Sequence, residues 1–336
     1  NNTTGTNNTA IGVGALQANT IGSSNSAFGY KSLQQNTTGS ANSAFGKDSL
    51  KYNTIGANNS AFGYRSLFGN TTGINNSAFG YKALTYNTTG SNNTAVGINS
   101  LNANTTGTSN TAVGLNSLLS NTIGLYNTAV GQQTLQANTT GTSNTAVGLQ
   151  ALYVNTGGYN NVAIGNAALA ANTIGINNVA VGHNSLITNV AGYANTAVGF
   201  QALENNTTNF NSAFGYRALR ANTTGINNTA VGYLSLTANT TGYNNSAFGY
   251  KSLFANTTGT YNTAIGFGTL QTNTTGSFNS AVGFGALLSN VTGNNNTAFG
   301  YFALFYNIAS NNSAFGINSL RNNTTGTNNT AIGRDS

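Results

Sequence analysis

The stretch Asn25–Leu33, NSAFGYKSL, followed by Asn36–Gly39, NTTG, is the unit from which this chain of 336 residues is built. Its tetrad of Ser or Thr (Val in two units), Ala, an apolar residue and Gly recurs 20 times, for example at Ser60–Gly63 and Thr330–Gly333. The step from one tetrad to the next is 17 residues, and only two steps are 16. The fold is therefore decided by how one short unit stacks on itself.

Several positions are the same in every complete unit, numbered from the first residue of the tetrad. Position 2 is Ala, position 4 is Gly, position 8 is Leu, and position 11 and the last position, 17, are Asn. Examples of the last three are Leu16, Leu33 and Leu101 at position 8, Asn19 and Asn36 at position 11, and Asn25 and Asn42 at position 17. The 16-residue units begin at Thr196 and Thr297, and we expect corner changes there without loss of register at Leu203 or Leu304.

This pattern predicts an all-β fold. A step of 17 residues is too short for a helical-hairpin repeat, and the Gly and Asn spacing would break a helix. Short strands separated by Gly and Asn corners fit instead. We predict a parallel β-solenoid, or β-roll, of about 20 coils that runs through residues 1–336 as a single continuous array. A rise of ~4.8 Å per coil would give a stiff rod on the order of 95 Å long.

The repeat also predicts which positions face inward. Positions 3, 8 and 13 are expected to supply one core side chain per short strand, and Gly at 4 suits a close approach between coils. Asn at 11 and 17 is expected to form two ladders of stacked amides at left-handed corners. All charged residues and His183 lie at positions 5, 6 or 9, so these positions are expected to face solvent.

Aromatic residues gather at position 5. They form an unbroken ladder over seven units, at Phe200, Tyr216, Tyr233, Tyr250, Phe267, Phe284 and Tyr301. A row of outward rings is a large apolar stripe for a lone soluble chain. Three roles are open for it: stacking that stiffens the rod, burial against sister chains, and stacking on sugars.

Composition argues against several functions. The carboxylates Asp48, Glu204 and Asp335 and the single His183 are isolated, so neither an enzyme nor a metal or cofactor site is expected. The chain has no Cys, so disulfides and thiol chemistry are excluded. Ten Lys and Arg are sparse against the charge density of DNA, so nucleic acid is not an expected partner, although weak attraction to anionic polysaccharide fits. No apolar run is long enough to cross a bilayer.

The unit Thr94–Asn110, with the pattern TAVGxxALxxNTTGxxN, resembles the head repeats of trimeric autotransporter adhesins. It is also similar to the arrays found ahead of the chaperone domain in phage-tail-fibre-like proteins. The adhesin-head repeat is typically shorter, and the unit here carries an apparent insertion of three residues. The resemblance implies a left-handed β-roll, three chains side by side, a cell-surface or virion-surface location, and a role in attachment.

We therefore expect a structural segment of an extracellular fibre, part of a longer chain, which associates with itself, and surface glycans are a second candidate partner. The alternatives are a glycan-binding solenoid and an ice-binding solenoid, the latter because Thr at position 12 and Ser or Thr at position 1 recur as an array. Asn-X-Thr at position 11 and many Asn-Asn-Ser/Thr runs, whose two asparagines are at positions 16 and 17, also match sugar-acceptor sites, and ladder formation is the competing explanation.

Overall fold

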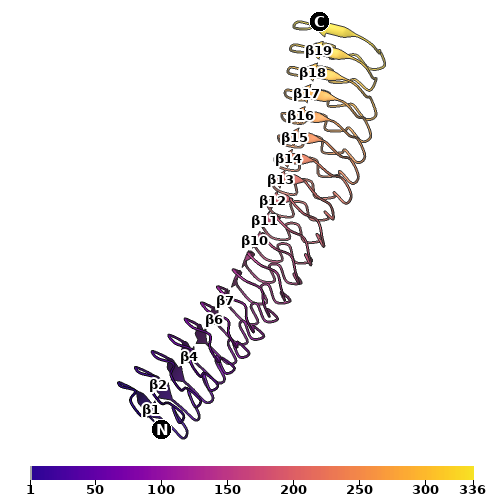
Figure 1. Cartoon of the computed structure of the whole chain (residues 1–336). Helices are drawn as coiled ribbons and strands as arrows, with labels where there is room; N and C mark the ends of the chain where they lie inside the picture. Colours follow the sequence, from indigo (N-terminus) through magenta and orange to yellow (C-terminus); the bar gives the residue numbers. More distant parts are fainter. Residues whose placement is uncertain (1) are drawn as a thin grey trace. The chain divides into compact units, whose positions relative to one another are not determined.

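The computed structural model describes residues 2–336 as two compact units, the first ending at Ile174 and the second spanning Gly175–Ser336. Each unit is a stack of parallel β-solenoid coils, and residues 2–336 contain no helix, so the predicted fold class is confirmed (Figure 1). The expectation of one continuous array through the whole chain stays a prediction.

Each coil contributes one strand of three residues, formed by positions 1 to 3 of the repeat. The first unit contains β1 (Thr9–Ile11), β2 (Ser26–Phe28), β3 (Ser43–Phe45), β4 (Ser60–Phe62), β5 (Ser77–Phe79), β6 (Thr94–Val96), β7 (Thr111–Val113), β8 (Thr128–Val130), β9 (Thr145–Val147) and β10 (Val162–Ile164). The second unit contains β11 (Val179–Val181), β12 (Thr196–Val198), β13 (Ser212–Phe214), β14 (Thr229–Val231), β15 (Ser246–Phe248), β16 (Thr263–Ile265), β17 (Ser280–Val282), β18 (Thr297–Phe299), β19 (Ser313–Phe315) and β20 (Thr330–Ile332).

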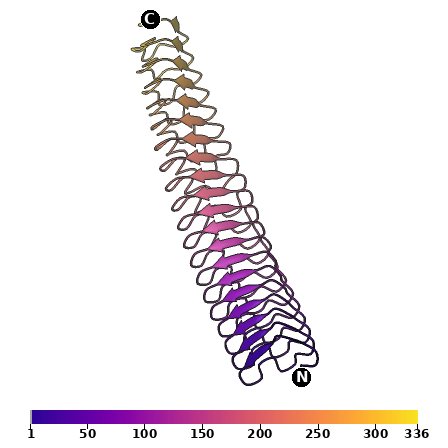
Figure 2. The ribbon, with the colours of Figure 1, turned by 90° about the vertical axis from the view of Figure 1, so that its left-hand side faces the viewer.

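Within each unit, successive strands pair in parallel and in register, so that equivalent positions of neighbouring coils lie side by side (Figure 2). Ala27 of β2 pairs with Ala44 of β3, for example. Backbone hydrogen bonds also join the coils outside the strands: Leu33 N donates to Ser49 O at 3.0 Å, and Thr37 N donates to Thr54 O at 2.9 Å. Because the bonding continues around the coil, a repeat with only three strand residues still stacks regularly.

The core is made of small and branched residues from fixed positions. Ala at position 2 and Leu at position 8 are fully buried in nearly every coil, as Ala27 and Leu33 illustrate. The prediction that positions 3 and 13 face inward is wrong: Phe79 at position 3 is 40% exposed and Ile55 at position 13 is 54% exposed. Side chains alternate along a strand, so the inward Ala at position 2 turns positions 1 and 3 outward.

The two asparagine ladders are present, and they are joined to each other. At position 11, Asn36 Nδ2 donates to Asn19 Oδ1 at 2.8 Å; at position 17, Asn42 Nδ2 donates to Asn25 Oδ1 at 3.2 Å. The carbonyl oxygen of Gly39, at position 14, accepts from both Asn36 and Asn25. Each coil therefore links the two ladders through one glycine carbonyl, which keeps buried amides hydrogen-bonded.

Left-handed backbone occurs elsewhere than expected. The ladder asparagines at 11 and 17 do not adopt it; positions 6, 8 and 16 do, as in Lys31 (φ 55°), Leu33 (φ 48°) and Asn58 (φ 58°). A left-handed leucine costs about 1–2 kcal/mol of backbone strain. Burial of its side chain contributes about 1.5–3 kcal/mol, which offsets that strain and explains why an unfavourable residue recurs at position 8.

The two 16-residue coils keep their register, as predicted. Ala197 of β12 pairs with Ala213 of β13, and Leu203 and Leu304 remain fully buried. The corner itself changes, as expected. The carbonyl of Thr208 accepts from the ladder asparagines, as the Gly carbonyl does elsewhere, while Asn209 Oδ1 accepts the backbone N–H of Tyr193 at 2.9 Å.

The second short coil interrupts one ladder. Asn307 Nδ2 donates to Ala309 O at 2.8 Å, and Asn290 Oδ1 is buried without a hydrogen-bond partner. The ladder resumes one coil later, where Asn323 Nδ2 donates to Asn307 Oδ1 at 2.8 Å. Loss of one residue at the corner therefore removes the amide–amide bond between Asn290 and Asn307 and redirects Asn312 Nδ2 to Asn307 Oδ1, while the strand register is unchanged.

Candidate functional site

The aromatic residues at position 5 of the second unit form one stacked column, which we call the aromatic column. It comprises Phe200, Tyr216, Tyr233, Tyr250, Phe267, Phe284 and Tyr301. Neighbouring ring centroids lie between 4.7 Å (Tyr250 and Phe267) and 5.4 Å, with ring planes within 18° of parallel. The His183 imidazole stacks on the first ring, Phe200, at 5.5 Å.

The spacing of the rings follows from the spacing of the coils. Parallel strands place equivalent residues ~4.8 Å apart, which is close to the separation of stacked aromatic rings. Because neighbouring rings are nearly parallel and their centroids are 4.7–5.4 Å apart, each inner ring of the column has another ring on both of its faces. Each ring is still 36–48% exposed, so the surface that remains consists mainly of ring edges and tyrosine hydroxyls.

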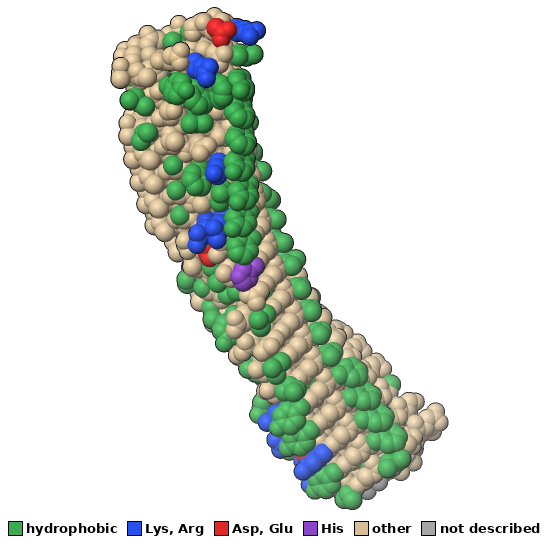
Figure 3. Space-filling view, turned by 180° about the vertical axis from the view of Figure 1, so that it is seen from behind, with side chains coloured by type: hydrophobic (Ala, Val, Ile, Leu, Met, Phe, Trp, Pro, Cys, Tyr) green, Lys and Arg blue, Asp and Glu red, His purple; other side chains and the backbone are tan. Residues whose placement is uncertain are grey.

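In the space-filling view, hydrophobic side chains form a band along the second unit, with the purple His183 at its foot (Figure 3). Position 3 adds to the apolar surface, because Phe214, Phe248 and Ile265 are also exposed there. In the first unit, position 3 carries its own stack, in which Phe28 and Phe45 lie 4.6 Å apart. Outward rings at position 3 were missed because the sequence was interpreted as placing this residue in the core.

Cations accompany several of these rings. The Arg217 guanidinium lies 5.1 Å from the centre of the Tyr216 ring, and Lys251 Nζ lies 5.4 Å from that of Tyr250. Every cation at position 6 directly follows a tyrosine at position 5, in the pairs Tyr30-Lys31, Tyr64-Arg65, Tyr81-Lys82, Tyr216-Arg217 and Tyr250-Lys251. That dipeptide is a sequence signal for cation–π contacts, and it was not recognised as one.

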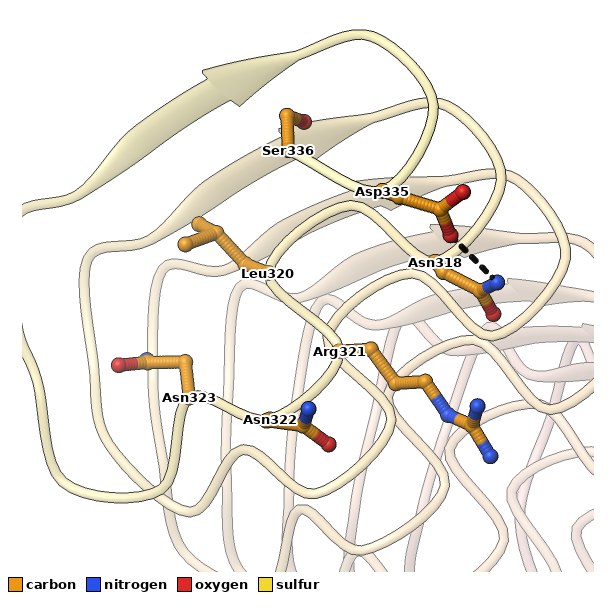
Figure 4. Close-up of a pocket in the computed structure, with 7 residues that line it drawn as sticks. All are labelled: Asn318, Leu320, Arg321, Asn322, Asn323, Asp335 and Ser336. Atoms are coloured by element: carbon orange, nitrogen blue, oxygen red, sulfur yellow. Dashed lines mark hydrogen bonds between the residues drawn. The ribbon is translucent and has the colours of Figure 1, made fainter.

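Among residues 2–336, no three His, Asp or Glu side chains come together as a potential metal site. The described part of the chain also has no helix that is both long and apolar enough to span a bilayer. A hollow of about 400 Å³ opens on the last coils, lined in part by Asn318, Arg321 and Asp335 (Figure 4). In it, Asn318 Nδ2 donates to Asp335 Oδ1 at 2.8 Å. This hollow lies where no further coil covers the stack, and we assign it no ligand.

Many of the recurring polar side chains form hydrogen bonds between neighbouring coils. The Thr37 hydroxyl at position 12 donates to the Thr54 carbonyl at 3.0 Å, and the same bond recurs in many coils. The position-12 hydroxyls therefore donate within the stack, which argues against an ice-binding role for this row, and absence of thermal hysteresis is the expected assay result. The ladder asparagines, such as Asn53, are buried with both amide hydrogens donated, which leaves no room for a sugar in the folded coil.

In comparisons with known proteins, no family model and no curated protein matches this chain.

Proposed function

We propose that this chain is a structural segment of a homo-oligomeric extracellular fibre, and that the aromatic column packs against other copies of the chain. The observation that carries the proposal is the column itself, seven rings in register with more than a third of each exposed. Contiguous apolar surface of this extent is typical of protein interfaces. The interior also supports a structural role, because its invariant Ala, Leu and Asn residues are buried and hold one coil against the next.

The column is better suited to packing against protein than to stacking on sugar. Sugars stack on the faces of aromatic rings, and within the column those faces already lie against neighbouring rings, as for Tyr233 between Tyr216 and Tyr250. Ring edges and hydroxyls can interlock with an equivalent column on a sister chain, where edge contacts between aromatic residues are favourable. The trimer and the attachment role rest on the repeat's resemblance to adhesin heads, and belong to the same proposal.

The test is the oligomeric state of the full chain, measured by analytical ultracentrifugation. We expect the unmodified protein to form a trimer, and the double variant Tyr233→Glu/Phe267→Glu to associate at least about tenfold more weakly, because it buries two carboxylates in the interface. The matched control is Tyr86→Glu/Tyr159→Glu, which places the same charges at exposed tyrosines outside the column.

Unmodified protein that remains monomeric at micromolar concentration would refute the packing role. Equal loss of association in the control variant would show that added charge alone, and not the column, is responsible. Surface labelling of intact cells or virions with an antibody against the chain tests the proposed location separately.

A further inference from the structure

Positive charge is concentrated on four successive coils of the first unit. They carry five of the ten Lys and Arg of the chain, which we call the basic patch: Lys31, Lys47, Lys51, Arg65 and Lys82. Asp48 is the only carboxylate on these coils, so their net charge is +4 out of +7 for the whole chain. Figure 3 shows Lys and Arg side chains gathered on the part of the surface near the N-terminus.

The cations of the basic patch lie on directly adjacent coils. Arg65 N donates to Lys47 O at 3.1 Å, and Lys82 N donates to Tyr64 O at 2.9 Å. Equivalent positions are therefore one strand spacing apart, ~4.8 Å, and Lys31 and Lys82 are separated by three such steps, ~14 Å. On these four coils position 6 carries Lys31, Asp48, Arg65 and Lys82, so one carboxylate interrupts the row, while Lys47 and Lys51 add positive charge at positions 5 and 9 of the coil that carries Asp48.

Aromatic rings hold these cations in place. Lys31 and Lys47 approach the Tyr30 ring, at 5.0 and 5.8 Å, and Lys82 lies 5.2 Å from the Tyr81 ring. Interaction with the Tyr30 side chain raises the pKa of Lys31, whose ammonium group is charged at neutral pH with or without that shift. Long side chains that are already positioned lose less conformational entropy when a ligand binds.

One carboxylate, that of Asp48, reduces the positive charge of the basic patch but does not neutralise it. Asp48 is only 6% exposed, contrary to the expectation that position 6 faces solvent, and its Oδ1 lies 3.4 Å from Lys51 Nζ. The Arg65 guanidinium stacks on the Phe68 ring at 4.7 Å, and its Nε is buried without a hydrogen-bond partner. Asp48 thus offsets Lys51, while four cations retain no carboxylate partner within ion-pair distance among the described residues.

We propose that the basic patch binds an acidic polysaccharide, an extended sugar chain that carries sulfate or carboxylate groups. Lys and Arg form short charge-assisted hydrogen bonds with such groups, and cations on four successive coils can contact several charged groups of one extended polyanion. Single-stranded nucleic acid fits less well, because it needs free aromatic faces for its bases. Here the Tyr30 ring has two cations over it, and the Tyr64 ring stacks on Tyr81.

This inference goes beyond the proposed function, since a fibre segment can be structural without it, and it rests on a different part of the chain. The probe is heparin, titrated into the chain of 336 residues by isothermal titration calorimetry at several salt concentrations. The test variant is Lys31→Gln/Lys82→Gln. The matched control, Arg217→Gln/Lys251→Gln, removes two cations from the same repeat position, also beside tyrosines, in the second unit.

We expect the test variant to bind heparin at least tenfold more weakly than the unmodified chain, and the control to stay within twofold. The slope of log affinity against log salt should fall by about two in the test variant, one for each cation removed. Circular dichroism of both variants checks that the fold is retained.

Equal weakening of heparin binding in both variants would overturn the inference, because the overall positive charge of the chain would then explain the binding without the basic patch. Absence of heparin binding by the unmodified chain would also overturn it, and so would tighter binding of single-stranded DNA of equal charge. The oligomeric state of the same samples separates the two proposals. If the chain is a trimer that does not bind heparin, only the proposal for the basic patch is contradicted. If it is a monomer that binds heparin, only the proposal of a homo-oligomeric fibre is contradicted.

Discussion

Replacing Gly266 by alanine is expected to destabilise the coils around it by about 4 kcal/mol. Gly266 is at position 4, with φ at +133°, a conformation that is open almost only to glycine and costs other residues about 1–3 kcal/mol. An added Cβ would also lie 2.5 Å from the carbonyl oxygen of Gly283 in the next coil. Overpacking of this kind costs about 1–3 kcal/mol more, because backbone must move.

Gly268→Ala is the matched control, two residues further along the same coil. Gly268 has φ +61°, a left-handed conformation that Lys251 and other non-glycine residues adopt at the same position. The nearest atom to its added Cβ is the movable Gln271 Oε1 at 3.1 Å. We expect a change in stability within about 1 kcal/mol, since the loss of backbone freedom in the unfolded chain offsets the strain.

Native-state hydrogen exchange is the appropriate measurement for this pair. Stacked repeats can open locally, so a single midpoint of unfolding would hide an effect confined to a few coils. Protection should fall in Gly266→Ala for the amides of β15, β16 and β17 and remain near normal in Gly268→Ala. Equal protection in the two variants would contradict the close approach at position 4.

Asn239→Ala is expected to destabilise the second unit by about 2–5 kcal/mol. The buried Asn239 amide donates to Asn222 Oδ1 and to Gly242 O, and its own oxygen accepts from Asn256 Nδ2, all at 2.8–2.9 Å. Its removal leaves Asn222 Oδ1 and one N–H of Asn256 buried without partners. Each such group costs about 1–3 kcal/mol. The Gly242 carbonyl keeps a second donor, Asn228 Nδ2, and adds little to the loss.

The control is Asn205→Ala, which removes an exposed asparagine of the same unit that lies outside both ladders. Its effect should stay within about 0.5 kcal/mol. Urea unfolding followed by circular dichroism, together with hydrogen exchange at the coils on either side, distinguishes the two variants. If Asn239→Ala unfolds like Asn205→Ala, the ladders are by-products of stacking and contribute nothing to stability.

Much of the fold could be predicted from internal comparison of the units. Every complete unit has a leucine equivalent to Leu33 and an asparagine equivalent to Asn36. These residues must therefore have the same surroundings in each unit, and a stack with one coil per unit provides them. The candidate surface was also predictable, because the seven residues from Phe200 to Tyr301 share one position and register alone brings them together. The basic patch was predictable in part, because its cations share positions 5, 6 and 9 and weak attraction to anionic polysaccharide was expected.

The wrong predictions came from inferring, from residue type alone, which way a side chain points and which residues adopt a left-handed backbone. Phe79 is apolar and was expected inside, yet it faces out, because the alternation of a three-residue strand is set by the buried alanine before it. Leu33 is a poor residue for a left-handed corner, and asparagine was expected at such corners instead. At both positions the packing of the coil overrides the residue's own conformational or burial preference, because the coil must enclose leucine and amide side chains within one narrow interior.

The sequence by itself determined the period, the parallel register and the identity of the stacked residues, because those depend only on recurrence. Tertiary structure alone decided which side of the coil each residue faces, where the left-handed backbone falls, and how Gly39 and its equivalents join the two ladders. These features depend on the closure of each coil around its interior, a three-dimensional constraint that no spacing along the chain encodes.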